Sequence, residues 1–265
     1  MKIDTHHALP DSIAVKIDGP IAIVSLTRAA KRNALNDPTV LGLGDFFRAP
    51  PDTIGAVVLL GEGDHFCAGL DLSELQERDA VEGMHHSRMW HEALDRISYG
   101  KVPVVAVLHG AVVGGGLELA AATHIRVAEA STFYALPEGQ RGIFVGGGGS
   151  VRIPRLMGVS RMADMMLTGR TYSAEEGLQA GLSQYLVPNG EGLAKGIELA
   201  KKIAGNASMT NFAVMHALPR IADTGRDEGL LTESLMAAIA QSAPEAKARI
   251  RDFMQKRAGS KVEKK

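Results

Sequence analysis

Short apolar runs and polar turns alternate in the N-terminal part of the chain. Residues 12–17 (SIAVKI) and 21–26 (IAIVSL) are rich in β-branched side chains, and Asp18-Gly19-Pro20 between them has the composition of a tight turn. Two such runs joined by a short turn are typical of a β-hairpin. We therefore expect the fold to begin with two antiparallel strands.

Further apolar runs downstream predict buried strands. They span residues 55–60 (GAVVLL), 103–108 (PVVAVL) and 132–135 (TFYA). A continuous apolar run of this length, without helical periodicity, is typical of a strand covered on both faces. These segments are expected to form the centre of a sheet.

Helical patterns separate the predicted strands. The first helix is expected to start near Asn36 or Asp37, either of which suits an N-cap, with Pro38 in its first turn. The stretch 81–98 has apolar residues at spacings of three and four, so it predicts an amphipathic helix with one inner face. That face comprises Val81, Met84, Trp90, Leu94 and Ile97. With a further short helix over about 116–122, the alternation predicts an α/β fold with crossover connections.

The second half of the chain is mainly helical in its pattern. Ser173 and Glu176 have the spacing of a capping box, followed by a short helix that ends at Gly181. Residues 190–258 carry almost continuous helical periodicity. The pattern suggests a core formed by residues 1–190 and a C-terminal helical region formed by residues 191–265.

Composition and charge restrict the classes of function. The 265 residues are 45% apolar, and 29 basic against 30 acidic side chains leave a formal net charge of −1. Such a balance gives no long-range field for nucleic acid. Cys67 is the only cysteine, which excludes an intrachain disulfide and a cysteine-rich metal site. With neither a signal sequence nor an apolar run of about 18 residues, we expect a cytoplasmic protein without a membrane partner.

Two loops that contain glycine follow two of the predicted strands. Residues 65–71 (HFCAGLD) come after the strand at 55–60, and residues 109–116 (HGAVVGGG) come after the strand at 103–108. Loops at the carboxyl ends of parallel strands are where α/β folds place ligands. Glycine lets the backbone approach a ligand closely, and an amide at a helix start is a donor for developing negative charge. Each loop is expected to supply one such donor.

Two glutamates near these loops are candidates for acid–base chemistry. Glu118 lies in the first turn of the helix after the glycines, and Glu138 lies in the loop after the next strand. Two neighbouring carboxyl groups in a dry pocket titrate apart, so that one holds a proton while the other accepts one. A structural alternative exists for each, because the helix dipole favours Glu118 and Glu138 fits a solvated loop. Asp71 likewise suits an N-cap for residues 72–78.

Other familiar motifs are absent. The run 146–150 (GGGGS) continues with Val151, so it does not match a dinucleotide-binding fingerprint or a P-loop. A serine nucleophile at Ser150 would need glycine where Arg152 stands. The histidines at positions 85, 86 and 91 have no carboxylate cluster at metal-ligand spacing, so no metal site is predicted.

The combination of motifs resembles the crotonase superfamily, the enoyl-CoA hydratase/isomerase family. The resemblance rests on FCAGLDL at 66–72, GAVVGGGLEL at 110–119 and Pro137-Glu138, with RNALN at 32–36 and LTGR at 167–170 in support. It extends from about Ile13 to Arg257. It implies a spiral of ββα units (the ClpP/crotonase fold) followed by a helical region that assembles a trimer, or a hexamer formed as a dimer of trimers.

The resemblance also implies a substrate and a site. The substrate would be an acyl-CoA thioester whose carbonyl oxygen lies between the amides of Ala68 and Gly115, and no other cofactor would be needed. Glu118 would activate water, and Glu138 would protonate the α-carbon. The remaining substrate-binding positions carried over from the family are Ala30, Leu70, Asp71, Leu72, Gly114 and Pro137.

Glutamate at both catalytic positions favours hydration, the syn addition of water to a 2,3-enoyl-CoA. An isomerase, which needs mainly the glutamate at 138, and a non-catalytic scaffold remain alternatives. A dehalogenase is disfavoured because Val145 stands in the region of its nucleophilic aspartate. His124 and Val145 both depart from residues common in the family, so the acyl group is left open and includes fatty, aromatic and alicyclic chains.

Overall fold

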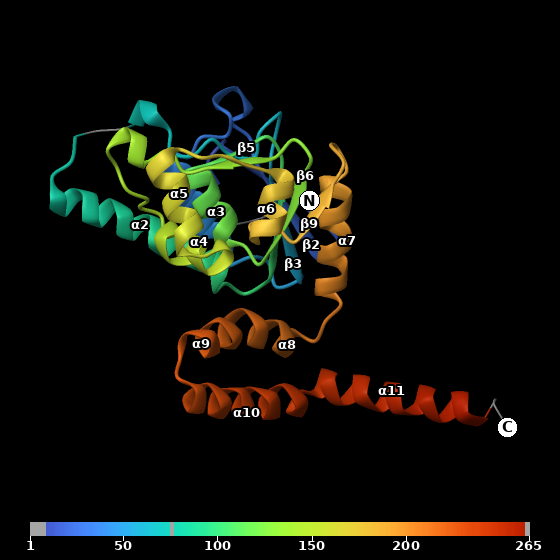
Figure 1. The fold of residues 1–265 in the computed structure, drawn as a ribbon. Coiled ribbons are helices and arrows are strands. Elements are labelled where there is room, and N and C mark those ends of the chain that lie inside the picture. Colours follow the sequence, from blue (N-terminus) through green and yellow to red (C-terminus); the bar gives the residue numbers. More distant parts are fainter. Residues whose placement is uncertain (1–8, 75–76, 263–265) are drawn as a thin grey trace. The chain divides into compact units, whose positions relative to one another are not determined.

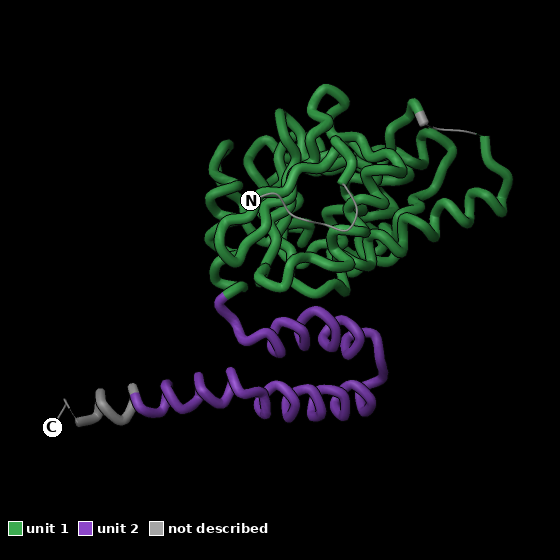
Figure 2. The backbone as a smooth tube through the Cα atoms, turned by 180° about the vertical axis from the view of Figure 1, so that it is seen from behind, with its two compact units in different colours: residues 1–204 green, residues 205–265 purple. Residues whose placement is uncertain are grey.

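The structure is a computed structural model that describes residues 9–74 and 77–262. The chain forms two compact units, residues 1–204 and residues 205–265, which Figure 2 shows in green and purple. The boundary therefore falls later than the one after residue 190 that the sequence pattern suggested. The helix that makes the difference, α7 (Gly192–Ala204), packs on the sheet of the first unit.

The larger sheet in the described part of the chain has six strands in the order β1-β2-β3-β4-β6-β9. Its strands are β1 (Ile13–Asp18), β2 (Ile21–Leu26), β3 (Ala56–Gly61), β4 (Val104–Leu108), β6 (Ile125–Glu129) and β9 (Tyr185–Val187). The predicted hairpin is confirmed, because β1 pairs antiparallel with β2, and Ile13 lies opposite Leu26. All the other pairings in this sheet are parallel, as the predicted crossovers require.

A smaller sheet lies beside the carboxyl ends of the central strands. It consists of β5 (Ala111–Val113), β7 (Phe133–Ala135) and β8 (Tyr172–Ser173). Of these strands and those of the larger sheet, β7 was predicted from the sequence, whereas β5, β6, β8 and β9 were not. Strands of two or three residues are too short to show a period of two, and the charged residues in β6 obscure its apolar positions.

Helices cover both faces of the larger sheet. Along β3 and β4, alternate side chains point to opposite faces, so Val58 and Val107 pack with Leu199 of α7, whereas Val57 and Leu59 join the main core. The main core lies under α1 (Asp37–Arg48), α2 (Ala80–Ser98) and α3 (Gly115–Ala122). Figure 1 shows α7 and α3 on opposite sides of these strands. Burial on both faces explains why β3 and β4 are continuous apolar runs.

The amphipathic helix α2 is present, but its buried face is shorter than predicted. Trp90, Leu94 and Ile97 are buried, whereas Val81 is 59% exposed and Met84 is 51% exposed. The first turns of α2 extend away from the rest of the unit in Figure 1. The prediction for Val81 and Met84 was therefore wrong, because periodicity shows which side of a helix is apolar and not how far the neighbouring layer reaches.

Caps that the sequence indicated are formed. Asn36 is the N-cap of α1, and its side chain accepts the amide of Thr39. Ser173 and Glu176 form a reciprocal capping box at α6 (Ala174–Ala180), which ends at Gly181 in the left-handed conformation. The first unit also contains the short 3₁₀ turns Ala29–Lys31, Leu72–Glu74 and Gly139–Arg141, and the helices α4 (Gly149–Met157) and α5 (Val159–Thr168).

The second unit consists of helices within its described residues. They are α8 (Ser208–Phe212), a π turn (Ala213–Ala217), α9 (Leu218–Asp223), α10 (Arg226–Ser242) and α11 (Pro244–Val262). Many apolar side chains of this unit are exposed, including Leu218, Leu231, Leu235 and Phe253. No helix in the described parts of the chain has the length and apolar character needed to cross a membrane.

Candidate active site

A cavity of about 360 Å³ lies in the first unit where the two glycine-containing loops meet α2. Eight of the residues predicted for the site line it, together with positions that were not predicted. The predicted ones are Ala68, Leu70, Leu72, Gly114, Gly115, Glu118, Pro137 and Glu138. The other walls come from α2, through Ser87 and Trp90, and from residues 143–147.

Backbone pairing brings the two loops together. The amide of Cys67 donates to the carbonyl of Ala111 at 3.0 Å, and the amide of Val113 donates to the carbonyl of Cys67 at 3.1 Å. The helix α3 then starts so close to this pair that a Cβ on Gly116 would lie 2.3 Å from the Cys67 carbonyl oxygen. Only glycine fits at that position, and the close approach brings the start of α3 beside residues 67–70.

Two backbone amides at this junction have no acceptor among the described residues. They are the N–H groups of Gly115 and Leu70, and the position of a Cβ on Gly115 is 3.4 Å from the Leu70 nitrogen. The amide of Ala68 is different, because it donates to the Arg32 carbonyl at 2.9 Å. The amide that the sequence analysis selected is therefore engaged, and the neighbouring free donor belongs to Leu70.

Glu118 is buried in the first turn of α3, and its carboxylate is held by the backbone. Its Oε1 accepts the amides of Gly147 and Gly149, each at 2.8 Å. Burial raises the pKa of Glu118, while these two amides and the positive charge of Arg152 counteract the rise. The carboxyl group is thus kept in one orientation in a site where its proton is bound more tightly than in water.

Glu138 follows β7 and packs against the other glycine of the loop. It is 8% exposed, and a Cβ on Gly114 would lie 2.6 Å from its Oε1. Its Oε2 is buried and has no hydrogen-bond partner in the described parts of the chain. Burial raises the pKa of Glu138, and the negative charge of Glu118 raises it further. This carboxyl group is suited to carry a proton.

Trp90 of α2 forms a wall beside the amide of Gly115. A Cβ on Gly115 would lie 3.1 Å from Cζ3 of the indole, and a Cβ on Gly147 would lie 3.0 Å from its Cε3. Ser87, one turn earlier on α2, donates to the Gly146 carbonyl at 2.6 Å and joins the helix to the facing segment. The cavity is therefore closed on this side by the indole ring and by a direct hydrogen bond.

Some predicted site residues lie elsewhere. Asp71 and Ala30 are not among the residues that line the cavity. Asp71 is 4% exposed and accepts hydrogen bonds from the side chain and amide of Ser73, so the N-cap interpretation is supported. Its other oxygen pairs with Arg28 at 2.6 Å, and these contacts lower the pKa of Asp71 to about 2. The structure gives Asp71 a role in fixing the loop.

Cys67 lies under the site rather than in it. The thiol is fully buried, and burial raises its pKa to about 12, so it is not a nucleophile at neutral pH. Residues 9–74 and 77–262 contain no group of three or more metal-ligating side chains that could hold an ion. The cavity walls carry the carboxyl groups of Glu118 and Glu138, together with the side chains of Arg78, His86, Ser87 and Arg141.

The part played by residues 146–149 was not predicted from the sequence. This glycine run does not match a nucleotide-binding fingerprint, and in the structure the amides of Gly147 and Gly149 donate to Glu118, 29 and 31 positions earlier in the chain. A run of glycines just before a predicted helix is a sign of exposed amide donors. The partner of those donors depends on the tertiary fold and leaves no local signal.

Comparison with known proteins shows one family over most of the chain. A sequence model described as enoyl-CoA hydratase/isomerase matches residues 16–261. The chain is 29% identical to the short-chain-enoyl-CoA hydratase of Clostridium acetobutylicum, over 93% of this chain and 96% of that protein. It is also 39% identical, over 65% of its length, to the fatty acid oxidation complex subunit alpha of Shewanella loihica. The matched segment covers 25% of that longer relative.

Solved structures extend the comparison to nearly the whole chain. A Rhodopseudomonas palustris protein named as a candidate enoyl-CoA hydratase is 60% identical, with a TM-score of 0.92 over 94% of this chain and 96% of that one. An enoyl-CoA hydratase from Bacillus anthracis is 28% identical, with a TM-score of 0.86 over 93% of this chain and 97% of that one. The expected α/β fold of the crotonase type is thereby confirmed. The chain belongs to the enoyl-CoA hydratase/isomerase family.

Proposed function

We propose that the protein is a hydro-lyase that adds water to 2,3-enoyl-CoA thioesters and gives 3-hydroxyacyl-CoA. The observation that supports this most directly is the pairing of Glu118 and Glu138 in one cavity, beside two free backbone amides. Hydration needs one group that removes a proton from water and another that delivers a proton to carbon. The two carboxyl groups differ in their partners, as such a division requires.

The free amides of Gly115 and Leu70 are the proposed oxyanion donors. As water adds to the β-carbon, negative charge develops on the thioester oxygen, and two amides at this position stabilise the enolate. Loss of one donor of this type typically costs about 3 kcal/mol of transition-state stabilisation. Leu70 replaces Ala68 in this role because the Ala68 amide already donates to Arg32.

Glu118 is the proposed base and Glu138 the proposed acid. Glu118 accepts a proton from water as the water oxygen bonds to the β-carbon. Glu138 gives its proton to the α-carbon as the enolate collapses to the thioester, so the product gains one water in total. Two amide donors orient Glu118 and favour its anion against the effect of burial, whereas the Oε2 atom of Glu138 has no donor among the described residues to stabilise its anion.

An isomerase that moves a double bond is the second candidate, and matched variants separate the two. The enoyl-thioester absorbance of crotonyl-CoA should fall with wild-type protein and stay constant with Glu118→Gln and with Glu138→Gln. Each glutamine keeps the size of the side chain and removes the acid–base function. A Glu118→Gln variant that still converts a 3-enoyl-CoA to the 2-enoyl form, in a protein that never hydrates crotonyl-CoA, would identify an isomerase.

The shape of the cavity favours a short acyl chain. Trp90 fills the space next to Gly115 and Gly147, and this is where we place the carbons beyond the β-carbon. The name of the Clostridium relative is consistent with a small acyl group. From family resemblance, we assign the adenine of coenzyme A to the neighbourhood of residues 70–72, of which Leu70 and Leu72 also line the cavity, and we add Ala30 as a substrate-binding position.

Assembly through the second unit is also part of the proposal. Its helices leave Leu218, Leu231, Leu235 and Phe253 exposed, which is unfavourable for a helical unit in isolation. A trimer or a dimer of trimers built through the second unit, residues 205–265, would cover these side chains. Light scattering of the purified protein tests this directly, and a monomeric mass would contradict it. A cytoplasmic location stays a prediction, consistent with the single buried cysteine.

A further inference from the structure

Arg152 of α4 bonds both to the glycine run 146–149 and to α2. From its place on α4, one guanidinium nitrogen donates to the Gly147 carbonyl at 2.9 Å. The other pairs with Asp95 of α2 at 2.6 Å. The arginine side chain is 14% exposed and its partner Asp95 is 54% exposed, so the fork reaches from a partly buried hydrogen bond with the Gly147 carbonyl to a carboxylate at the surface. The planar guanidinium makes both contacts at once, which a single ammonium group cannot do in the same geometry.

The glycine run is held to α2 at a second point as well. Ser87 donates to the Gly146 carbonyl at 2.6 Å, next to the residue that Arg152 holds. The same run carries the amides of Gly147 and Gly149 that hold Oε1 of Glu118. The peptide groups on both sides of Gly147 are therefore used, with the carbonyl bound to Arg152 and the amide bound to the glutamate.

We propose that Arg152 is a positioning residue for Glu118: it ties the 146–149 segment to α2 and so fixes the two amides that orient the carboxylate. The inference rests on the proposed function, in which Glu118 activates water. Arg152 does not contact the substrate in this scheme. Its contribution is to keep the Glu118 carboxylate aimed at the water while the water oxygen bonds to the β-carbon.

The charges around Glu118 give the tie a second consequence. Arg152 on α4 and His91 on α2 lower the pKa of Glu118, and Glu138 faces it from the segment after β7. Removing the guanidinium takes away one positive charge and loosens two amide donors. Both changes raise the pKa of Glu118, so a larger fraction of the base is protonated at a given pH. The acidic limb of the rate profile then moves to higher pH.

Arg152→Met and Arg152→Lys are the informative variants, with crotonyl-CoA hydration followed across pH. For Arg152→Met we expect kcat to fall by about 100-fold, KM to change much less, and the acidic limb of kcat/KM to move to higher pH. Lysine restores positive charge without the fork. It should return the limb toward that of wild type and leave kcat about tenfold low. Asp95→Asn keeps Arg152 and weakens one end of the tie, so a smaller fall in kcat is expected.

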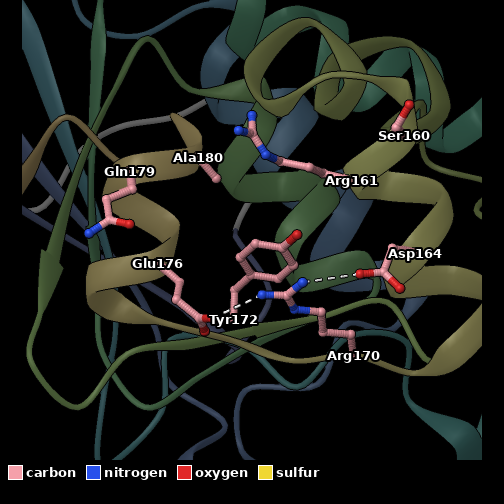
Figure 3. A pocket seen from close by; sticks show the side chains of 8 residues that line it. All are labelled: Ser160, Arg161, Asp164, Arg170, Tyr172, Glu176, Gln179 and Ala180. Carbon is pink, nitrogen blue, oxygen red and sulfur yellow. Dashed lines mark hydrogen bonds and ion pairs between the residues drawn. The ribbon is translucent and has the colours of Figure 1, made fainter.

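Arg170 provides a matched control in the same unit (Figure 3). It pairs with Asp164 at 3.3 Å and with Glu176 at 3.0 Å, and its guanidinium lies over the Tyr172 ring. Arg170→Met therefore also removes a guanidinium that pairs with carboxylates, at a surface pocket whose lining residues include none of those around Glu118. Its kcat and its pH profile should match those of wild type.

The outcomes separate the tie from a general loss of stability. Equal effects of Arg152→Met and Arg170→Met, or full recovery of kcat by Arg152→Lys, would overturn the positioning role. An infrared titration of the Glu118 carboxyl band, assigned by its absence in Glu118→Gln, gives a readout without turnover. If wild type fails to hydrate crotonyl-CoA, the proposed function fails, while the infrared shift in Arg152→Met still tests the tie. An unshifted band would overturn the tie itself.

Discussion

Gly114→Ala isolates the placement of Glu138 from the rest of the site. Gly114 has φ 53° and ψ −122°, a region that side chains other than glycine rarely adopt. An alanine there should lower the free energy of unfolding by about 1–3 kcal/mol through backbone strain. Its Cβ would also lie 2.6 Å from Oε1 of Glu138, so the carboxyl group must withdraw by on the order of 1 Å.

The displacement of the Glu138 carboxyl group is the effect that should change the catalytic rate. A displacement of about 1 Å at a catalytic group typically costs about 100-fold in rate, so kcat for crotonyl-CoA hydration should fall by that factor. The assay is the loss of enoyl-thioester absorbance, alongside urea denaturation. Because Glu138 has a flexible side chain, it turns away at little cost, and the stability loss should stay within the range set by strain.

Gly158→Ala is the matched control for backbone strain. Gly158 has φ 86° and ψ 150°, and a Cβ there would meet nothing within 4 Å. It should lose a similar free energy of unfolding and keep a kcat within about threefold of wild type. If Gly114→Ala is destabilised like the control and also keeps its kcat, the assignment of Glu138 as the positioned acid is refuted.

Two further predictions concern the carboxyl groups and the indole wall. Burial raises the pKa of both Glu118 and Glu138. At a pH above the ordinary pKa of glutamate, the folded state therefore binds more protons than the unfolded state, and the wild-type free energy of unfolding declines as pH rises through the raised pKa values. In thermal melts, Glu118→Gln and Glu138→Gln should therefore gain stability relative to wild type between acidic pH and pH 8; a constant difference across pH would contradict this. Trp90→Leu should raise the kcat/KM ratio for octenoyl-CoA over crotonyl-CoA by at least about tenfold, and an unchanged ratio would mean that the acyl chain leaves by another path.

Long segments with a clear apolar pattern made most of the fold predictable from sequence. The hairpin, β3 and β4 are apolar runs of five or six residues, α2 is long enough to show helical periodicity, and the capping box at Ser173 marks a helix start by local contacts alone. The strands β5, β8 and β9 have no such length. They are strands because neighbouring backbone offers hydrogen bonds, which is a property of the assembled sheet.

The candidate site was predictable only where its residues belong to a contiguous motif. Gly115, Glu118 and Glu138 lie in such motifs, and all three line the cavity. The choice between the Ala68 and Leu70 amides was not predictable, because it depends on a hydrogen bond to Arg32 across the fold. A free amide donor is recognised by its lack of an acceptor in the folded chain, and the sequence does not show this.

The buried thiol of Cys67 can report local unfolding of the first unit without any added label. The backbone on either side of this residue joins the two loops of the site, and α3 covers it closely. A thiol reagent reaches Cys67 only when the two loops and α3 separate. The rate of modification in native buffer therefore measures how often this part of the active site opens by local unfolding. Saturating substrate, by bridging the two loops, should slow that reaction. Conversely, a cysteine introduced on the surface would be the sole rapid target for a label, leaving every natural residue of the site untouched.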